Sequence, residues 1–346
     1  MNSNIHASSL LPEEIFSVYN LNAKYRANQI FKWISCGVTS FDEMTNLSKD
    51  LRESLSKIAP IYNTKILKTL KDPDGTIKIQ LGFSDLSDGK ENLSAVESVL
   101  LTDIEGRKTA CISTQIGCPM RCAFCQTGQL GFLRNLDAGE IVEQFYCLEK
   151  MISSPIDNVV FMGMGEPLLN LENVRKAIKI LTDVNGRNFS HRRFTLSTCG
   201  IVPGIIDLAD NGPEIRLAIS LTTASSELRD RLMPVNLQYP LPELKKALQY
   251  FSNKTGKRIT LEAALLHDVN TTPMACEELI DFSKNINALI NLIPWNPVES
   301  LEFEEPNKKE ITTFVEKLKK AGLQVTLRQK RGREIGGACG QLGKVD

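Results

Sequence analysis

Three cysteines lie close together in the segment GCPMRCAFCQTGQLGF (117–132), at Cys118, Cys122 and Cys125. Thiolates are ligands for soft metals. A structural zinc site and an iron–sulfur cluster usually take four protein ligands, whereas this segment supplies three and no histidine lies near it in the sequence. A cluster that is held by three cysteines leaves one iron with an open position. The spacing therefore predicts a [4Fe–4S] cluster whose open iron binds a small molecule.

Three other interpretations of this segment stay open from the residues alone. One is a zinc knuckle whose fourth ligand lies elsewhere in the chain, and another is chance clustering of buried cysteines. The third is a redox Cys-x2-Cys pair. A redox pair leaves the third cysteine and the intervening Pro119, Met120 and Arg121 without a role.

The composition predicts a cytoplasmic protein with no membrane span. The start, MNSNIHASSLLPEEIF, lacks the basic residues and apolar centre of a signal peptide, and no apolar run approaches the roughly 20 residues of a membrane helix. Thiols stay reduced in the cytoplasm, so the nine cysteines are not expected to form a disulfide framework. Lys+Arg and Asp+Glu both number 41, so an RNA-binding surface must come from local segregation of charge.

The chain divides into a helical start, a strand-rich stretch and a long strand–helix alternation. Apolar residues at helical spacing predict helices within 11–20, 24–37 and 41–59. An Asp-Gly turn signal before an alternating run predicts strands within 64–102. Further strands are expected at 109–115, 158–164, 194–200, 215–221, 258–266, 290–295 and 323–328. Helices are expected between them, at 138–151, 170–184, 226–233, 241–256, 276–286 and 307–322.

This alternation favours a parallel sheet that is covered by helices. About six βα units are available, fewer than the eight of a closed barrel. The predicted fold class is α/β, a partial (βα)6 TIM-like barrel with a small helical N-terminal accessory domain and a short β-rich extension. The expected divisions are 1–62, 63–96 and 97–346. The cysteine segment follows the first strand of the alternation, where sites gather in such sheets.

The cysteine segment resembles the signature of the radical S-adenosylmethionine (SAM) enzymes. The resemblance rests on C-x3-C-x2-C in a loop after the first strand of a βα repeat, with the aromatic Phe124 before the last cysteine. In those enzymes the open iron binds the amino and carboxylate groups of SAM, and one electron cleaves SAM to methionine and a 5′-deoxyadenosyl radical. The resemblance implies one [4Fe–4S] cluster with three cysteine ligands, completed by SAM.

A set of stretches narrows the resemblance to the RlmN-type dual-specificity RNA methyltransferases. In chain order they are FKWI…FDEMTNLSKDLR, GRKTACISTQIGC, FMGMGEPLLN, STCGIVPGI, LAISLTTASSELRDRLMPVN, NLIPWNP and RGREIGGACGQL. They run from about residue 25 to the C-terminus. The resemblance implies methylation of adenine C2 in 23S ribosomal RNA, at the peptidyl transferase centre, and in the anticodon loop of transfer RNAs.

The family's mechanism assigns roles to three residues of this sequence. One SAM methylates a cysteine in ACGQL, here Cys339, because a thiolate is a competent nucleophile. A second SAM gives the radical, which takes a hydrogen from the S-methyl group, and the resulting carbon radical adds to adenine C2. The base that removes the C2 proton is Glu97 by position. Cys111 then attacks the Cys339 sulfur and frees the product, which leaves a transient disulfide.

The resemblance also implies the residues that bind SAM, most of them at or near expected strand ends. They are Gly165, Glu166, Ser197, Ser220, Leu221, Thr222 and Asn296. Glycine at position 165 allows the backbone to approach the amino-acid end of SAM. Many family members carry histidine where this chain has Thr222. A contact through the backbone would survive that difference, whereas a contact that needs imidazole would be lost or changed.

The basic run RQKRGR supplies the predicted RNA contacts, Arg328, Lys330, Arg331 and Arg333, which would neutralise phosphates near Cys339. A solvated charge run is the alternative interpretation. The partners implied by the resemblance are 23S ribosomal RNA and transfer RNA, with a flavodoxin- or ferredoxin-type protein as electron donor. The family suggests a monomer.

Three alternative functions remain for comparison. The related enzyme that methylates adenine C8 and confers antibiotic resistance shares the machinery, but Pro167, Trp295 and the Arg331-Gly332 pair resemble the C2 enzymes more closely. Radical SAM methylthiotransferases need a second three-cysteine cluster, and no such spacing remains. A non-catalytic, zinc-stabilised RNA-binding protein would have no need for the ordered motifs. The remaining cysteines, Cys36, Cys147, Cys199 and Cys276, are interpreted as structural.

Overall fold

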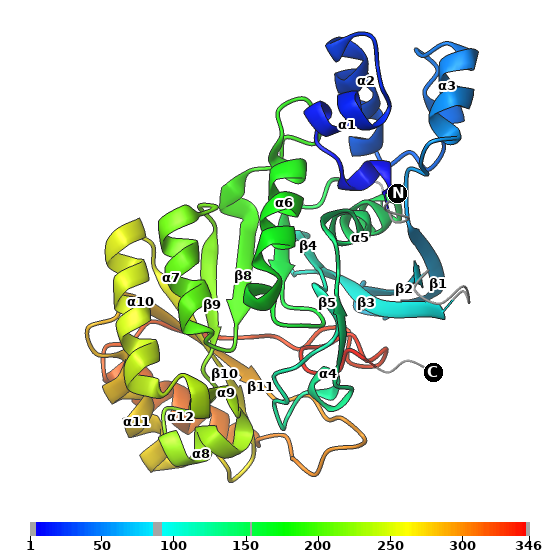
Figure 1. Cartoon of the computed structure of the whole chain (residues 1–346). Helices are drawn as coiled ribbons and strands as arrows, with labels where there is room; N and C mark the ends of the chain where they lie inside the picture. Colours follow the sequence, from blue (N-terminus) through cyan, green and yellow to red (C-terminus); the bar gives the residue numbers. More distant parts are fainter. Residues whose placement is uncertain (1–4, 86–91, 153, 344–346) are drawn as a thin grey trace.

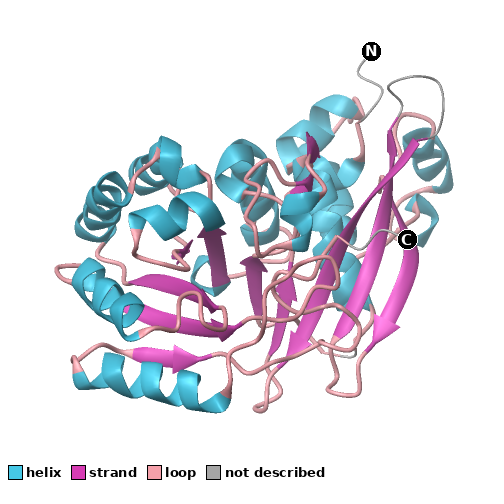
Figure 2. Cartoon of the chain, turned by 90° about the horizontal axis from the view of Figure 1, so that it is seen from below, coloured by secondary structure: helices cyan, strands magenta, loops and turns pink. Residues whose placement is uncertain are grey.

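The computed structural model describes residues 5–85, 92–152 and 154–343, and its main feature is one sheet with the strand order β1-β2-β3-β4-β7-β8-β9-β10-β11-β12 (Figure 1). Strands β4 to β12 of this order run parallel to one another. Their bounds are β4 (Lys108–Cys111), β7 (Asn158–Phe161), β8 (Phe194–Thr198), β9 (Arg216–Ser220), β10 (Ile259–Leu265), β11 (Ala288–Pro294) and β12 (Val325–Leu327). Seen from below, the strands form a curved sheet with helices around its outside (Figure 2). This arrangement confirms the predicted α/β class with a partial barrel.

Helices connect successive parallel strands and cover the outer face of the sheet (Figure 1). The six long ones are α5 (Ala138–Lys150), α6 (Leu171–Thr182), α7 (Val202–Asn211), α10 (Leu241–Thr255), α11 (Pro273–Ser283) and α12 (Lys308–Lys320). Three short ones are α4 (Gln126–Gln129), α8 (Ser226–Leu232) and α9 (Val235–Gln238). The sequence patterns did not predict α7. Its second and third residues, Pro203 and Gly204, suggest a loop, but proline is favourable in the first turn of a helix.

The first expected strand, 109–115, is divided in the structure. Strand β4 ends at Cys111, and Gln115 begins a separate strand, β5 (Gln115–Gly117), which pairs with β6 (Phe132–Asn135) in a two-stranded sheet. The chain between β5 and β6 carries the three-cysteine segment. A small antiparallel ribbon therefore supports that segment at both ends.

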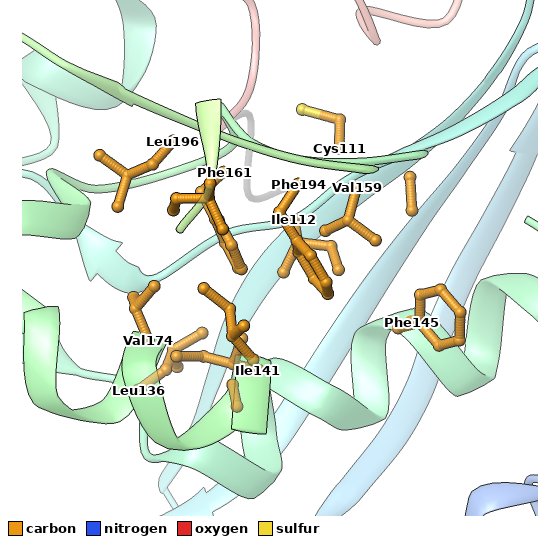
Figure 3. Packing of buried hydrophobic residues seen from close by; sticks show 14 of the residues in the cluster. Cys111, Ile112, Leu136, Ile141, Phe145, Val159, Phe161, Val174, Phe194 and Leu196 are labelled. Carbon is orange, nitrogen blue, oxygen red and sulfur yellow. The ribbon is translucent and has the colours of Figure 1, made fainter. Parts of the chain in front are cut away.

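The core beneath the sheet is apolar and closely packed. Ile141 and Phe145 of α5 and Val174 of α6 are fully buried, on the side of the sheet to which Ile112 and Phe161 point (Figure 3). Burial of each such side chain contributes roughly 1.5–3 kcal/mol. Cys111 precedes Ile112, and its side chain points to the opposite side of the sheet in Figure 3. The alternation of the strand thus turns the Cys111 sulfur toward the inner face.

The N-terminal region is helical, with α1 (Pro12–Val18), α2 (Lys24–Ser35) and α3 (Lys49–Ser56). Its main anchor is His6, which is buried and lies 3.0 Å from Asp137 and 2.8 Å from Glu143 of α5. Burial disfavours the imidazolium, but the hydrogen bonds with Asp137 and Glu143 outweigh it and raise the pKa of His6 to about 10. The helices are therefore attached to the barrel through a buried ionic cluster.

The β-rich extension continues the main sheet. Strands β1 (Thr64–Lys71), β2 (Ile77–Asp85) and β3 (Asn92–Thr102) are antiparallel, and β3 pairs with β4. The expected division between residues 96 and 97 thus falls inside β3. No helix in the described ranges combines the length and apolar character that a membrane crossing requires.

Candidate active site

The cysteine segment is held in a defined conformation by backbone contacts. Gly117 has a φ of +71°, and a Cβ there would lie 1.9 Å from the carbonyl oxygen of Gly131. The amide of Cys118 donates to that carbonyl over 2.7 Å. Farther along, Ala123 donates to the carbonyl of Leu232 over 2.9 Å. Glycine is therefore required at position 117 for the close pairing of the two strands that present the cysteines.

A cavity of about 170 Å³ opens at the carboxyl ends of the parallel strands, beside the cysteine segment. Ten of the predicted site residues line it: Cys118, Cys122, Cys125, Gly165, Glu166, Ser197, Ser220, Thr222, Asn296 and Cys339. Leu221 does not line it, because its side chain is fully buried in the core. Cys111 and Glu97 border two neighbouring cavities instead.

The three thiols of the segment are in surroundings that disfavour free thiolates. Burial raises the pKa of Cys118 to about 12 and raises that of Cys122 well above its usual range. Burial also raises the pKa of Cys125, although hydrogen bonds from Gly128 and Thr127 oppose it. The negative charges of the neighbouring Cys125 and Cys118 thiolates raise the pKa of Cys122 further. A bound metal centre would supply the positive charge that this site needs.

The spacing of the three sulfurs bears on the zinc alternative. Within the described ranges, only His267, Asp268 and Glu310 bring three potential ligand atoms within 4.8 Å of one another. The cysteine sulfurs are spread more widely than that, whereas bonds of 2.3 Å to one tetrahedral zinc would bring them to about 3.8 Å. The three sulfurs are therefore not placed as the ligands of one bound zinc ion would be.

Gly165 and Glu166 form a tight turn after β7. Gly165 has a φ of +99°, and a Cβ on it would lie 2.5 Å from Cβ of Gln115. The carboxylate of Glu166 accepts from the amides of Leu168 and Cys199, over 3.0 and 2.8 Å, and burial raises its pKa. The Glu166 side chain therefore fixes the loop, which leaves the backbone at position 165 to face the cavity.

Thr222 has an unusual backbone for a β-branched residue, with a φ of +59°. Its amide donates to the carbonyl of Glu262 over 3.0 Å, and its own carbonyl accepts from the Asn270 side chain over 2.8 Å. Such strain persists only where the surroundings over-determine it, and it is frequent at ligand sites. The peptide at Thr222 is thus held at the cavity wall independently of its side chain.

Polar side chains from adjacent strands meet on the cavity wall. Ser197 lies 3.3 Å from Ser220, oxygen to oxygen, and donates to the carboxylate of Glu262 over 3.0 Å. Asn296 donates to the carbonyl of Cys339 over 3.2 Å, while its buried Oδ1 has no partner among the described residues. A buried acceptor without a partner, beside hydroxyls and a carboxylate, suits a ligand that has hydrogen-bond donors.

Cys339 lies between this cavity and a second, smaller one of about 50 Å³, which Cys111 and Arg328 also line. Burial raises the pKa of Cys111 to about 12, and the nearby Cys339 raises it further, while the charge of Arg328 opposes both effects. The Cys339 thiolate in turn raises the pKa of Arg328, with smaller contributions from Glu262 and Cys111. Arg328 therefore faces the cysteine pair.

The other predicted RNA contacts have partners within the protein. Lys330 and Arg333 both pair with Glu305, Arg333 over 2.9 Å, and Arg331 donates to the carbonyl of Asp74. These interactions orient the segment that precedes Cys339. The four cations do not form one free basic surface, because Arg328 faces the cysteines and the other three contact Glu305 or Asp74.

Glu97 lies in β3 and is buried, with 4% of its side chain exposed. Its Oε1 is 2.7 Å from Nζ of Lys78, and its Oε2 accepts from the amide of Gly343 over 2.7 Å. Lys78 and Glu97 line a third cavity, of about 530 Å³. The predicted base therefore lies on the floor of a separate, larger opening next to the C-terminal segment.

Three site residues were missed by the sequence analysis: Lys78, Arg229 and Glu262. Arg229 is fully buried, donates to the carbonyl of Cys199 over 2.6 Å, and has its pKa lowered to about 10 by burial, against the opposing charges of Cys199 and Cys122. Cys199, interpreted as structural, also lines the main cavity. No local motif signals these positions, since their importance depends on burial and on partners distant in the sequence.

The parallel partial barrel and its three-cysteine site define a radical SAM enzyme, and residues 112–275 match the family model of the Radical SAM superfamily. Residues 16–61 match the Ribosomal RNA large subunit methyltransferase N-terminal domain. A crystal structure of a radical SAM methyltransferase from Sphaerobacter thermophilus is similar, with a TM-score of 0.93 and 34% identity over 98% of this chain and 99% of that one.

Curated relatives are similar over nearly the whole chain. The probable dual-specificity RNA methyltransferase RlmN of Treponema denticola is 56% identical over 98% of this chain and 95% of its own length. The protein of the same description from Treponema pallidum strain Nichols is 51% identical over 98% of this chain and 97% of its own. The chain belongs to the RlmN family of dual-specificity RNA methyltransferases.

Proposed function

We propose that this enzyme methylates C2 of adenine in 23S ribosomal RNA and in the anticodon loop of transfer RNAs, through an S-methylcysteine on Cys339, with two SAM molecules per turnover. The observation that carries the proposal is the position of Cys339 between two cavities. One cavity contains the three cysteines of the metal site, and the other contains Cys111. A single sulfur can therefore face a SAM site on one side and a second thiol on the other.

The residues of the main cavity fit the cofactors of the family. Cys118, Cys122 and Cys125 would hold a [4Fe–4S] cluster, and SAM would complete it against the backbone of Gly165 and Thr222 and the side chains of Ser197, Ser220 and Asn296. When bound and reduced by one electron, this pair of cofactors supplies a carbon radical that can take a hydrogen atom from a nearby methyl group. The unpartnered Oδ1 of Asn296 supports a ligand at this wall.

Cys339 performs the nucleophilic part of the reaction. Its thiolate takes a methyl group from SAM, and the nearby Arg328 guanidinium stabilises negative charge on sulfur at this position. The methylated sulfur then carries the carbon that becomes bonded to adenine C2. Removal of the C2 proton is assigned to the carboxylate of Glu97.

Cys111 completes the turnover by attack on the Cys339 sulfur, which releases the methylated base and leaves a disulfide. Burial keeps Cys111 protonated before that step, since its pKa is raised to about 12. The charge of Arg328 opposes this rise in pKa, so it favours the thiolate of Cys111. The disulfide must be reduced before the next turnover, which suits a transient bond.

RNA and an electron donor complete the proposed system. The segment that contains Arg328, Lys330, Arg331 and Arg333 lies beside the cysteine pair and would contact the target nucleotide. Lys330 and Arg333, which pair with Glu305 in this structure, would then bind phosphate groups of the RNA in its place. A flavodoxin- or ferredoxin-type protein is proposed as the electron donor, and a monomer as the active form.

Mass spectrometry of an RNA fragment tests the proposal. The fragment contains the target adenine and is incubated with anaerobically reconstituted enzyme, methyl-labelled SAM and a reductant, next to the Cys339→Ala and Cys111→Ala variants. We expect label at adenine C2, no label with Cys339→Ala, and a covalent protein–RNA adduct with Cys111→Ala. Label at C8 would assign the chain to the resistance enzymes. Absence of RNA label from an enzyme that cleaves SAM would overturn the substrate assignment.

A further inference from the structure

The largest of the cavities that border the predicted site residues, about 530 Å³, has a buried ion pair in its wall. Lys78 of β2 and Glu97 of β3 face each other across adjacent strands with 2.7 Å between Nζ and Oε1, and their side chains are 7% and 4% exposed. The remaining walls come from β1, from the loop 297–300 and from the C-terminal segment 333–341. A buried pair of charges at the floor of an open cavity is costly unless the site uses it.

We propose that Lys78 is a positioning residue, which fixes the Glu97 carboxylate at the floor of this cavity so that it can take the proton from the target base. The cavity would receive the flipped-out adenine nucleotide, because the base must leave its stack to reach a buried carboxylate. This inference rests on the proposed function, in which Glu97 acts as the base.

The geometry leaves the carboxylate little freedom. Lys78 holds Oε1, and the amide of Gly343 donates to Oε2 over 2.7 Å. Each carboxylate oxygen has a second lone pair, so the group can still accept a proton from the cavity side. In that step the C2–H bond of the adduct breaks, its electron pair stays in the purine, and the proton forms an O–H bond on Glu97.

The same lysine also fixes the segment that carries Cys339. Its Nζ donates to the carbonyl of Gly336 over 3.2 Å, three residues before Cys339, while Glu97 accepts from Gly343, four residues after it. The ion pair therefore sets the position of the base and of the methyl-bearing cysteine relative to each other. Loss of the ammonium would leave a buried carboxylate without its counter-ion and free to turn away from the base.

The test separates positioning of the base from a general structural role. Lys78→Met, Lys78→Arg and the wild type are reconstituted and incubated with RNA whose target adenine carries hydrogen or deuterium at C2. Lys71→Met serves as the control, because Lys71 is an exposed lysine of β1 whose register partner is Ile77. Three quantities are measured: methylation of Cys339 without RNA, the covalent protein–RNA adduct on denaturing gels, and the rate of C2 methylation.

For Lys78→Met we expect Cys339 methylation slower by less than about fivefold, because the contact of Lys78 with Gly336 is lost. RNA methylation should be slower by about a hundredfold, the range of a lost general base. The adduct accumulates, and deuterium at C2 slows the variant more than the wild type. Lys78→Arg restores most of the rate, and Lys71→Met behaves as the wild type.

Two results would overturn the inference. One is an isotope effect and an adduct level in Lys78→Met equal to those of the wild type. The other is an equal loss of Cys339 methylation and of every later step, which would assign Lys78 to folding alone. If the wild type itself places no methyl group at C2, the proposed function fails, and the role of Lys78 fails with it.

Discussion

Hydrogen bonds fix the backbone on both sides of Thr222 at the wall of the main cavity. The amide of Thr222 donates to the carbonyl of Glu262, and the carbonyl of Thr222, in the next peptide group, accepts from the side chain of Asn270. Asn270 also donates to the carbonyl of Ala264 over 2.7 Å. A ligand that contacts this backbone gains from its fixed position, because no conformational entropy is lost on binding. The threonine side chain adds nothing to that arrangement.

This arrangement predicts that SAM binds mainly to the backbone at position 222. Thr222→Ala should change the dissociation constant for SAM by less than about threefold. Asn270→Ala should weaken binding by about tenfold, since the carbonyl of Thr222 loses the hydrogen bond that holds it. Titration calorimetry of the reconstituted variants measures both values. A loss of tenfold or more in Thr222→Ala would show that the hydroxyl itself binds.

Arg229 is a second residue whose importance depends on burial. It has no carboxylate partner among the described residues, and it donates instead to the carbonyls of Cys199, Ser220 and Leu221. These carbonyls lie at the end of β9 and in the loops that follow β8 and β9, next to the cavity wall. The positive charge lies near Cys122, where it can offset the charge of a thiolate-bound cluster.

We expect Arg229→Met to lower the free energy of unfolding by about 3 kcal/mol, because several buried carbonyls lose their donor. Arg231, which is exposed on the same helix, is the matched control. Arg231→Met should change the free energy of unfolding by less than about 0.5 kcal/mol. Urea unfolding of the anaerobic apoproteins measures both. Equal stability of the two variants would contradict the role of Arg229.

At the residue scale, the sequence predicts local patterns better than tertiary partners. Cys118, Cys122 and Cys125 are recognisable because metal ligands from one loop keep a short spacing. Lys78 and Glu97 are nineteen residues apart, and only the register of β2 against β3 brings them together. Burial of both charges is a property of the fold, so no spacing signals it.

At the scale of elements, the C-terminal segment is held by the turn between β1 and β2. The carboxylate of Asp74 accepts from the amide of Gly332 over 2.8 Å, and Asp72 accepts from the amide of Glu334 over 3.2 Å. These contacts precede Cys339 by only a few residues. The β-rich extension therefore acts as the platform on which the segment with Cys339 is fixed.

Asp74→Ala should loosen this segment without unfolding the barrel. We expect the amides near Gly332 to exchange with deuterium at least about tenfold faster, since the amide of Gly332 loses its acceptor, the Asp74 carboxylate. We also expect Cys339 to be alkylated faster. Peptide mass spectrometry measures both quantities. Glu105→Ala, in the exposed turn between β3 and β4, is the control. Unchanged exchange in Asp74→Ala would mean that the segment is held elsewhere.

Elements with a clear period were predicted well. Helices α5, α6, α10 and α12 follow from apolar residues at helical spacing, and the parallel strands follow from short apolar runs between them. The break between β4 and β5 could not be predicted, because 109–115 reads as one continuous strand pattern. It depends on the pairing of β5 with β6, which lies beyond the cysteine segment.

At the scale of the whole molecule, the N-terminal helices are joined to the barrel through His6. Ser8 and the amide of Asn63 add hydrogen bonds to the same buried carboxylate, Glu143. The side chain of Lys176 reaches Glu14 of α1 over 2.8 Å as a second connection. The orientation of the helical region relative to the catalytic cavity therefore depends on these charged contacts together with apolar packing, such as the stacking of Tyr62 on Tyr146 of α5.

The His6 cluster predicts a stability that depends on pH. The pKa of His6 is raised to about 10 in the folded protein, against 6.5 for an ordinary histidine. Between pH 6.5 and pH 10, His6 is therefore protonated in the folded state and neutral in the unfolded state. The contribution of the His6 charge to folding stability is complete below pH 6.5 and is lost as the pH rises through 10. At pH 6, His6→Ala should lower the free energy of unfolding by about 3 kcal/mol, the cost of a broken buried ion pair.

The difference between the wild type and His6→Ala should shrink as the pH rises from 6.5 to 10, because the wild-type imidazole then loses its own charge. Urea unfolding at several pH values measures it, with His191→Ala as the control, since His191 is exposed and outside the cluster. Cys339 methylation should stay unchanged in His6→Ala, because no described residue of the helical region lines the two cavities that Cys339 borders. A difference in stability that does not vary with pH would mean that His6 acts by packing, and that its charge does not join the helices to the barrel.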